Sequence, residues 1–242
     1  MLLAIDVGNT QIKLAVFEEN TLVNKKIISF FEWKKEVENT LIFFSEIKNI
    51  AVASVGKLQK SDFLGLKEGI EVSFISHESK FPFQNHYETP NTLGIDRMVL
   101  TSGAVLQFPN QNRLVIDAGT CITYDFVDEN NVYHGGAISP GIRLRYESLN
   151  NFTVNLPLLT IDQPKNSIGN STEQSIHSGV INGITFEIDG FISSILNKND
   201  NFIIILTGGD AEFLAERLKN TIFANSNFLL ESLNQTFQYN QQ

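Results

Sequence analysis

The stretch Leu3–Asn20, LAIDVGNTQIKLAVFEEN, aligns without gaps on residues 114–131, LVIDAGTCITYDFVDENN, at an offset of 111. Seven of the eighteen pairs are identical, and they include Asp6 with Asp117 and Gly8 with Gly119. Each copy runs from a short apolar strand through Asp-x-Gly into a second strand, which is the pattern that opens a β-hairpin. Self-similarity of this kind indicates a duplication. We therefore expect two halves that each begin with a meander.

Apolar periodicity outside the repeat predicts a mixed α/β chain with one lobe over residues 1–112 and a second over residues 113–242. Pro109–Asn112 is the expected hinge, because a new apolar strand follows it. The expected helices are Phe31–Lys48, Ile95–Gln107, a long helix opened by the capping pair Ser171 and Gln174, and Ala211–Lys219. The expected strands are Ile50–Val55, Ile70–Ile75 and Phe202–Leu206, and the tail Gln235–Gln242 is expected to fray.

Composition limits the classes of partner. The chain has 242 residues and a formal charge of −9, which opposes binding to nucleic acid or to anionic membranes. Cys121 is the only cysteine, so no disulfide can form within the chain, and the apolar run Phe202–Leu206 is too short to cross a bilayer. The four histidines lack the spacing of zinc ligands. We expect a cytoplasmic protein with neither nucleic-acid nor membrane partners.

The first turn of the repeat carries groups suited to phosphate. Gly8 lets backbone N–H groups approach a phosphate, Asn9 and Thr10 add side-chain donors, and Lys13 supplies a positive charge. Asp6 can hold a magnesium ion through water, because magnesium takes only one or two carboxylates besides substrate phosphates. The alternative is an ordinary hairpin turn with a surface lysine.

Two further glycine turns strengthen the nucleotide interpretation. Asp117-Ala118-Gly119-Thr120 repeats the acid, so two such turns facing each other across a central cleft would hold a triphosphate from both ends. In Thr207-Gly208-Gly209-Asp210 the glycines allow a flat base such as adenine to lie against the backbone. The alternatives are a capped turn and a plain strand-to-helix connection.

Between the two halves lies Tyr87-Glu88-Thr89-Pro90-Asn91-Thr92-Leu93-Gly94-Ile95-Asp96-Arg97. Asp96 can accept a proton from an alcohol, and the Arg97 guanidinium can hold a carboxylate with two hydrogen bonds. The alternative is a surface ion pair at the start of a helix.

Three of these segments, taken in order, resemble the phosphate and adenosine motifs of the superfamily of acetate kinase, sugar kinases, chaperone ATPases and actin. That resemblance implies a duplicated ribonuclease H-like α/β fold, known as the actin-like ATPase fold, and the use of ATP. The spacing of Tyr87, Pro90 and Gly94-x-Asp96-Arg97 resembles the substrate signature of type III pantothenate kinases. Gly135–Gly141, GGAISPG, and Gly169–Glu173, GNSTE, also resemble motifs of that family.

The family resemblance implies phosphorylation of pantothenate by ATP, the first step of coenzyme A biosynthesis. It implies Asp96 as the general base and Asp117 as the ligand of a potassium or ammonium ion, with magnesium near Asp6, and a homodimer. The implied substrate contacts are Tyr87, Gly94, Ile95, Asp96, Arg97 and Thr172, and the implied nucleotide contacts are Asp6, Gly8, Asn9, Thr10, Lys13, Thr120, Gly208 and Gly209. Cys121 departs from the family, which more often has alanine there.

Two other functions use the same fold. One is a kinase or phosphatase of the superfamily that acts on a sugar, a carboxylic acid or polyphosphate, and Tyr87 with the pair Asp96 and Arg97 argues against it. The other is a nucleotide-binding regulator without catalysis. The acid expected to face the alcohol, Asp96, argues against the regulator because a protein that only binds has no use for it.

Overall fold

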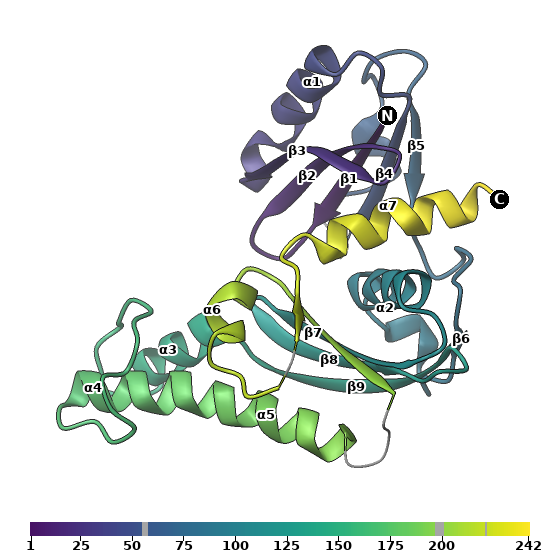
Figure 1. Ribbon diagram of the computed structural model, residues 1–242. Coiled ribbons are helices and arrows are strands. Elements are labelled where there is room, and N and C mark those ends of the chain that lie inside the picture. The colour runs from purple at the N-terminus through teal and green to yellow at the C-terminus, as the bar shows by residue number, and fades with distance from the viewer. Residues whose placement is uncertain (55–57, 197–200, 221) are drawn as a thin grey trace. The chain divides into compact units, whose positions relative to one another are not determined.

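The structure is a computed structural model that describes residues 1–54, 58–196, 201–220 and 222–242 (Figure 1). The chain forms two compact units. Unit 1 comprises Met1–Asn110, Val127–Gly135 and Asn227–Gln242, and unit 2 comprises Gln111–Phe126 and Gly136–Ser226. The last sixteen residues, which the repeat assigned to the second lobe, thus belong to the same compact unit as the N-terminal strands.

The N-terminal sheet has five strands in the order β3-β2-β1-β4-β5. β1 is antiparallel to β2 and parallel to β4, and β4 is parallel to β5. The strands are β1 (Leu2–Val7), β2 (Ile12–Glu18), β3 (Thr21–Ile28), β4 (Asn49–Ser54) and β5 (Glu71–Phe74). Val55, expected to end the fourth strand, lies outside the described residues.

The second sheet has the order β11-β10-β7-β8-β9-β6. Its members are β7 (Asn112–Ala118), β8 (Cys121–Val127), β9 (Val132–Pro140), β10 (Phe202–Thr207), β11 (Phe223–Ala224) and β6 (Gln84–Asn85). Without β6, the order β9-β8-β7-β10-β11 reproduces the first sheet strand for strand, and β7, β10 and β11 are parallel as β1, β4 and β5 are. This repetition of topology confirms the expected duplication.

The described residues of unit 1 form three α-helices, and the sequence predicted α2 well but not α7. α1 (Trp33–Phe43) buries Val37 and Leu41 against the first sheet, and α2 (Ile95–Gln107) has the predicted bounds. α7 (Phe228–Asn240) packs against α2 and β1, so the prediction of a frayed tail was wrong. Short 3₁₀ turns lie at Phe30–Glu32, Lys60–Phe63 and Pro90–Thr92.

Unit 2 covers its strands with α3 (Ile142–Asn151), α4 (Thr172–His177), α5 (Gly183–Leu196) and α6 (Ala211–Ala215). A single π-helical turn, Ser178–Asn182, joins α4 to α5. Thr172–Leu196 is the one stretch of the described residues that is long and apolar enough to span a membrane by length and composition. Its buried residues Ile176, Val180, Ile184, Ile188 and Ile192 belong to the core of unit 2, which accounts for its apolar composition.

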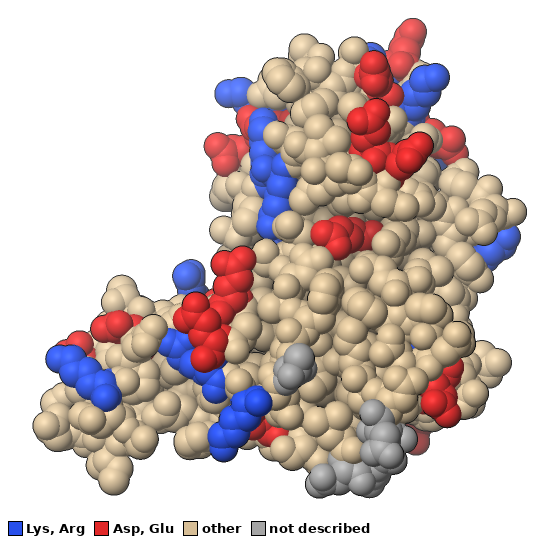
Figure 2. Space-filling view, in the orientation of Figure 1, with Lys and Arg blue, Asp and Glu red and all other residues tan. Residues whose placement is uncertain are grey.

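Charged side chains are interspersed on the face shown in Figure 2, where acidic and basic groups lie next to one another. On that face no broad basic area is present that would attract a polyanion.

Candidate active site

The first phosphate turn joins β1 to β2. Antiparallel pairing sets Asp6 opposite Lys13, and the Lys13 Nζ lies 3.5 Å from the Asp6 Oδ2. The Gly8 N–H donates to the Gln11 carbonyl at 3.1 Å, which closes the turn and leaves Asn9 exposed at its tip. The arrangement places a buried acid and a half-buried lysine beneath exposed polar donors.

Ionisation of the Asp6 carboxyl is unfavourable in the folded protein. Burial raises its pKa from 3.8 to about 6, the nearby Lys13 charge opposes that rise, and the Asp96 carboxylate adds to it. Only 5% of Asp6 is exposed, so little water can stabilise its charge. Asp96, ninety residues away in the sequence, is therefore close enough in unit 1 to act on the carboxyl at the phosphate turn.

Asp96 lies in the first turn of α2, and a glycine makes its conformation possible. Its Oδ1 accepts the Arg97 backbone N–H at 2.9 Å. A Cβ placed on Gly94 would lie 2.4 Å from that oxygen, so a side chain there would displace the carboxylate. Gly94 thus sets the position of the acid, and the neighbouring Ile95 packs against the apolar cluster around Met98.

Arg97 is buried, with 5% of its surface exposed, and its Cζ lies 5.7 Å from the centre of the Tyr87 ring. This contact is a cation–π interaction, which holds the guanidinium over the ring. Tyr87 in turn packs beside Tyr133 and lies over Gly135, where an added Cβ would be 3.2 Å from the Tyr87 ring. Gly135 has a φ of +100°, a conformation that other residues rarely adopt.

The second phosphate turn belongs to unit 2. Asp117 is half-buried near the end of β7, the Gly119 N–H donates to the Cys121 carbonyl at 3.0 Å, and Thr120 is exposed. Gly208 has a φ of +99°, and an added Cβ would lie 2.5 Å from the Asp117 Oδ1. Glycine is therefore required at 208 for the backbone to lie against Asp117, whereas Gly209 has open space around it.

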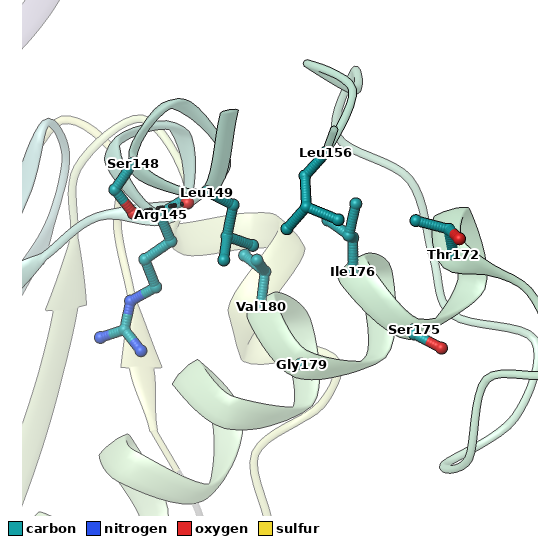
Figure 3. A pocket seen from close by; sticks show the side chains of 9 residues that line it. All are labelled: Arg145, Ser148, Leu149, Leu156, Thr172, Ser175, Ile176, Gly179 and Val180. Carbon is teal, nitrogen blue, oxygen red and sulfur yellow. Dashed lines mark hydrogen bonds between the residues drawn. The ribbon is translucent and has the colours of Figure 1, made fainter. Parts of the chain in front are cut away.

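Thr172 lies elsewhere in unit 2, at the first residue of α4. Ser171 caps this helix by accepting the Gln174 N–H at 3.2 Å, which confirms the predicted cap. Thr172 lines a cavity of about 640 Å³ whose wall includes Ile176 and Leu156 (Figure 3). Figure 3 also shows Arg145 on α3 at the opposite end of this cavity.

The structure distributes the expected site residues over both units. Unit 1 holds Asp6, Gly8, Asn9, Thr10, Lys13, Tyr87, Gly94, Ile95, Asp96 and Arg97, and unit 2 holds Asp117, Thr120, Thr172, Gly208 and Gly209. Within unit 1 the chain brings Asp6 and Lys13 together with Asp96, and within unit 2 it brings Asp117 against Gly208. Sequence reasoning did not single out Glu187 of unit 2, which accepts hydrogen bonds from Tyr124, Ser139 and Arg145, because a single acid on an apolar helix gives no motif.

The donors of unit 1 suit a magnesium ion. Among the described residues no group of three or more His, Cys, Asp or Glu side chains is arranged to hold a metal. Magnesium does not need such a group, because water and substrate phosphates fill most of its coordination sphere. A buried carboxyl whose pKa is raised to about 6 is a donor that a divalent cation would stabilise in its ionised form.

Comparison with known proteins decides the family. A family model described as type III pantothenate kinase matches residues 2–194. Relatives of that name in Flavobacterium psychrophilum and Flavobacterium johnsoniae are 64% and 62% identical, over 99% of this chain and 99% and 98% of their own lengths. The chain belongs to the type III pantothenate kinase family. Membership confirms the expected activity of this kinase, the phosphorylation of pantothenate by ATP in coenzyme A biosynthesis.

Solved structures agree with the fold. Lmo2764 of Listeria monocytogenes, assigned as an N-acetylmannosamine kinase, superimposes on the kinase with a TM-score of 0.57 at 14% identity, covering 100% of this chain and 99% of the other. At that identity the likeness concerns the fold alone. With the repeated strand order it confirms the duplicated ribonuclease H-like fold.

Burial of Asp6 predicts a pH-dependent cost to stability in the ligand-free protein. Between the unfolded pKa of 3.8 and the folded value of about 6, the folded state keeps a proton that the unfolded chain has lost. The free energy of unfolding therefore falls as the pH rises through this window. Asp6→Asn should remove that fall and stabilise the protein by about 2 kcal/mol more at pH 7.5 than at pH 4, since one pKa unit corresponds to about 1.4 kcal/mol.

Urea unfolding at the two pH values measures the difference. Lys13→Met is the matched control, because loss of the cation raises the Asp6 pKa further and should extend to higher pH the range over which stability falls. Equal stabilisation of Asp6→Asn at both pH values would show that the Asp6 carboxyl is not desolvated.

Proposed function

We propose that this kinase uses Asp96 as the general base that activates the primary hydroxyl of pantothenate. The observation that carries the proposal is the position of Asp96 in the first turn of α2, near enough to the phosphate turn of unit 1 for its charge to raise the pKa of the buried Asp6. An acid in this position can act on an alcohol next to the nucleotide phosphates.

The proposed step is an in-line phosphoryl transfer. Asp96 takes the proton of the primary hydroxyl, the hydroxyl oxygen forms a bond to the γ-phosphorus, and the bond from that phosphorus to the β–γ bridging oxygen breaks. ADP leaves with the electron pair of that bond, and the product is 4′-phosphopantothenate. The transition state is loose, so positioning and neutralisation of charge supply most of the rate.

Nucleotide contacts are proposed for the three glycine turns. Gly8, Asn9, Thr10 and Lys13 would contact phosphate in unit 1, and Thr120 would do so in unit 2. Gly208 and Gly209 would lie against the adenosine, and the open space around Gly209 supports this assignment. A magnesium ion held through Asp6 would neutralise charge on the phosphates.

A potassium or ammonium ion is proposed at Asp117. The offset of the repeat aligns Lys13 of the first copy with Tyr124 of the second, so the second copy has a tyrosine at the position of the lysine that faces Asp6. Tyr124 instead donates its hydroxyl to Glu187 at 2.8 Å. Glycine at 208 lets the backbone lie close to the Asp117 carboxylate, so an ion there would take its oxygen ligands from Asp117 and from nearby backbone carbonyls such as that of Ala118.

Pantothenate contacts are proposed for Tyr87, Gly94, Ile95 and Arg97 in unit 1. The cation–π contact with Tyr87 holds the Arg97 guanidinium in one orientation, which suits it to bind the substrate carboxylate with two hydrogen bonds. Thr172 in unit 2 is proposed as a further substrate contact, and its place on the wall of a cavity supports that role.

We also propose a cytoplasmic homodimer. Unit 2 exposes large apolar side chains on α5 and on the long segment after α3, namely Phe152, Val154, Ile168 and Phe186, with exposed fractions of 88%, 97%, 85% and 64%. Large apolar side chains exposed to this degree are typical of a surface that a partner covers. The cytoplasm is proposed because a chain with one cysteine gains nothing from an oxidising compartment.

Asp96→Asn tests the base. The amide oxygen can still accept the Arg97 N–H, so the start of α2 should keep its shape while the base is lost. We expect kcat to fall about 10²–10⁴-fold with the affinity for ADP unchanged. Near-normal turnover measured with the purified variant would remove Asp96 from this role.

Arg97→Ala tests recognition of the carboxylate. A charged two-bond contact contributes roughly 1.5–3 kcal/mol, so KM for pantothenate should rise about 10–100-fold. Arg97→Lys should restore only part of the affinity, because an ammonium keeps the charge without the planar pair of donors. For pantothenamides, which carry an amide in place of the carboxylate, the rise in KM caused by Arg97→Ala should be much smaller. Equal losses for both substrates would mean that Arg97 supports the local fold.

The monovalent cation is tested by exchange of salts. Rates measured in potassium and in ammonium should greatly exceed the rate in sodium, because the ion must match the size and geometry of its ligands. Asp117→Asn should weaken the response to potassium. Equal rates in sodium and potassium would contradict an ion site at Asp117.

Light scattering tests the dimer. The wild-type protein should have twice the mass of one chain, and Val154→Asp should shift it towards monomer because a charge would be buried in the interface. Phe31→Asp is the matched control, since Phe31 is 98% exposed in unit 1 and the interface is proposed for unit 2. A wild-type protein that scatters as a monomer at working concentration would overturn this assignment.

A further inference from the structure

Glu187 connects three elements of unit 2 through one carboxylate. This side chain of α5 accepts a hydrogen bond from the Tyr124 hydroxyl of β8 at 2.8 Å and another from the Ser139 hydroxyl of β9 at 2.5 Å. It also accepts the Arg145 Nη2 from α3 at 2.6 Å. None of the proposed nucleotide or substrate contacts involves Glu187.

The Glu187 carboxylate is held in its charged form. Burial alone would raise its pKa, yet the hydrogen bonds from Ser139, Arg145 and Tyr124 outweigh burial and hold the pKa below its usual range. Hydrogen bonds to an ionised acceptor are about twice as strong as bonds between neutral groups. The three contacts therefore fix the ends of β9 and α3 firmly to α5.

The backbone that follows Ser139 is held from both sides. Arg145 uses its Nη2 for Glu187 and its Nε for the Pro140 carbonyl, which it reaches at 2.9 Å. Ser139, which precedes Pro140 in the chain, donates a hydrogen bond to the same Glu187 carboxylate. The position of Pro140 therefore depends on Glu187 through two separate contacts.

Gly141 transmits this position to the second phosphate turn. Its N–H donates to the Thr120 carbonyl at 3.0 Å. A Cβ placed on Gly141 would lie 2.2 Å from the Gly119 carbonyl oxygen and 2.6 Å from that of Thr120. Backbone packs directly on backbone here, so any shift of Pro140 and Gly141 must move the turn.

We propose that Glu187 is a positioning residue for the phosphate turn Gly119–Thr120 and thereby for the nucleotide. It acts through Ser139 and Arg145 on Pro140, and through Gly141 on Thr120. This inference rests on the proposed function in one respect, the contact of Thr120 with ATP.

Steady-state kinetics of Glu187→Ala test the proposal. Displacement of the turn should lower kcat/KM for ATP about 10–100-fold, because misplacement of a positioning group by an ångström has effects of this size. KM for pantothenate should stay within about twofold of the wild-type value. Glu187→Gln should give an intermediate loss, since its amide oxygen still accepts from Tyr124 and Ser139 while its NH₂ group cannot accept from Arg145.

Asp189→Asn on the same helix is the matched control. Asp189 is buried and accepts the Lys219 N–H at 3.2 Å and the Asn220 amide at 3.5 Å, and within the described part of the chain these bonds do not lead to the phosphate turn. A merely structural role for Glu187 predicts equal kinetic effects for Glu187→Gln and Asp189→Asn at equal loss of unfolding free energy. That result would overturn the proposal, and a selective loss of ATP affinity in the Glu187 variants would support it.

A second measurement requires no nucleotide. Cys121 is the only cysteine and is exposed directly after Thr120, so a ¹⁹F-bearing thiol reagent attached there reports the shape of the turn. The ¹⁹F resonance should shift or broaden in Glu187→Gln and stay unchanged in Asp189→Asn. An unchanged resonance in folded Glu187→Gln overturns the proposal. Failure of the wild-type protein to bind ADP, with the resonance still responsive to Glu187→Gln, would instead overturn the contact between Thr120 and ATP.

Discussion

A buried carboxylate at the end of a central strand is the constraint on which the rest of the site depends. Asp6 keeps 5% of its surface exposed, has one lysine 3.5 Å away and feels the negative charge of Asp96. Such a group destabilises the empty protein at neutral pH and is stabilised when cations approach. The cost to stability and the proposed binding of magnesium at Asp6 thus have the same physical origin.

Duplication supplied two copies of this acid, and the two surroundings then diverged. The first copy has Lys13 opposite the acid, whereas the corresponding position of the second copy is Tyr124, whose hydroxyl is bonded to Glu187. The monovalent ion is proposed for the second acid, Asp117. The tyrosine joins the strand after the second turn to the hydrogen-bond network around Glu187. One topology therefore yields two phosphate turns with different electrostatics.

The sequence predicted the parts of the fold that depend on local pattern. The repeat at an offset of 111 predicted two similar halves, which the matching strand orders confirm, and apolar periodicity predicted the bounds of α2. It failed at the C-terminus because α7 is held by distant partners: the Asn234 amide donates to the Glu19 carbonyl, and the Thr236 hydroxyl to Ser102. Local polarity alone suggested a frayed tail. In the site, the motifs predicted which residue types are present. The effect of the Asp96 charge on Asp6 and the three hydrogen bonds to Glu187 depend on which residues folding brings together.

We propose that Arg97 holds the carboxylate of pantothenate while Asp96 activates its primary hydroxyl. The reaction of purified protein with ATP, pantothenate, magnesium and potassium, followed by ³¹P NMR before and after addition of hydroxylamine, tests that orientation. We expect one new phosphate monoester resonance that hydroxylamine leaves unchanged. A product that hydroxylamine destroys would be an acyl phosphate, and it would show that the carboxylate, not the hydroxyl, faces the γ-phosphate.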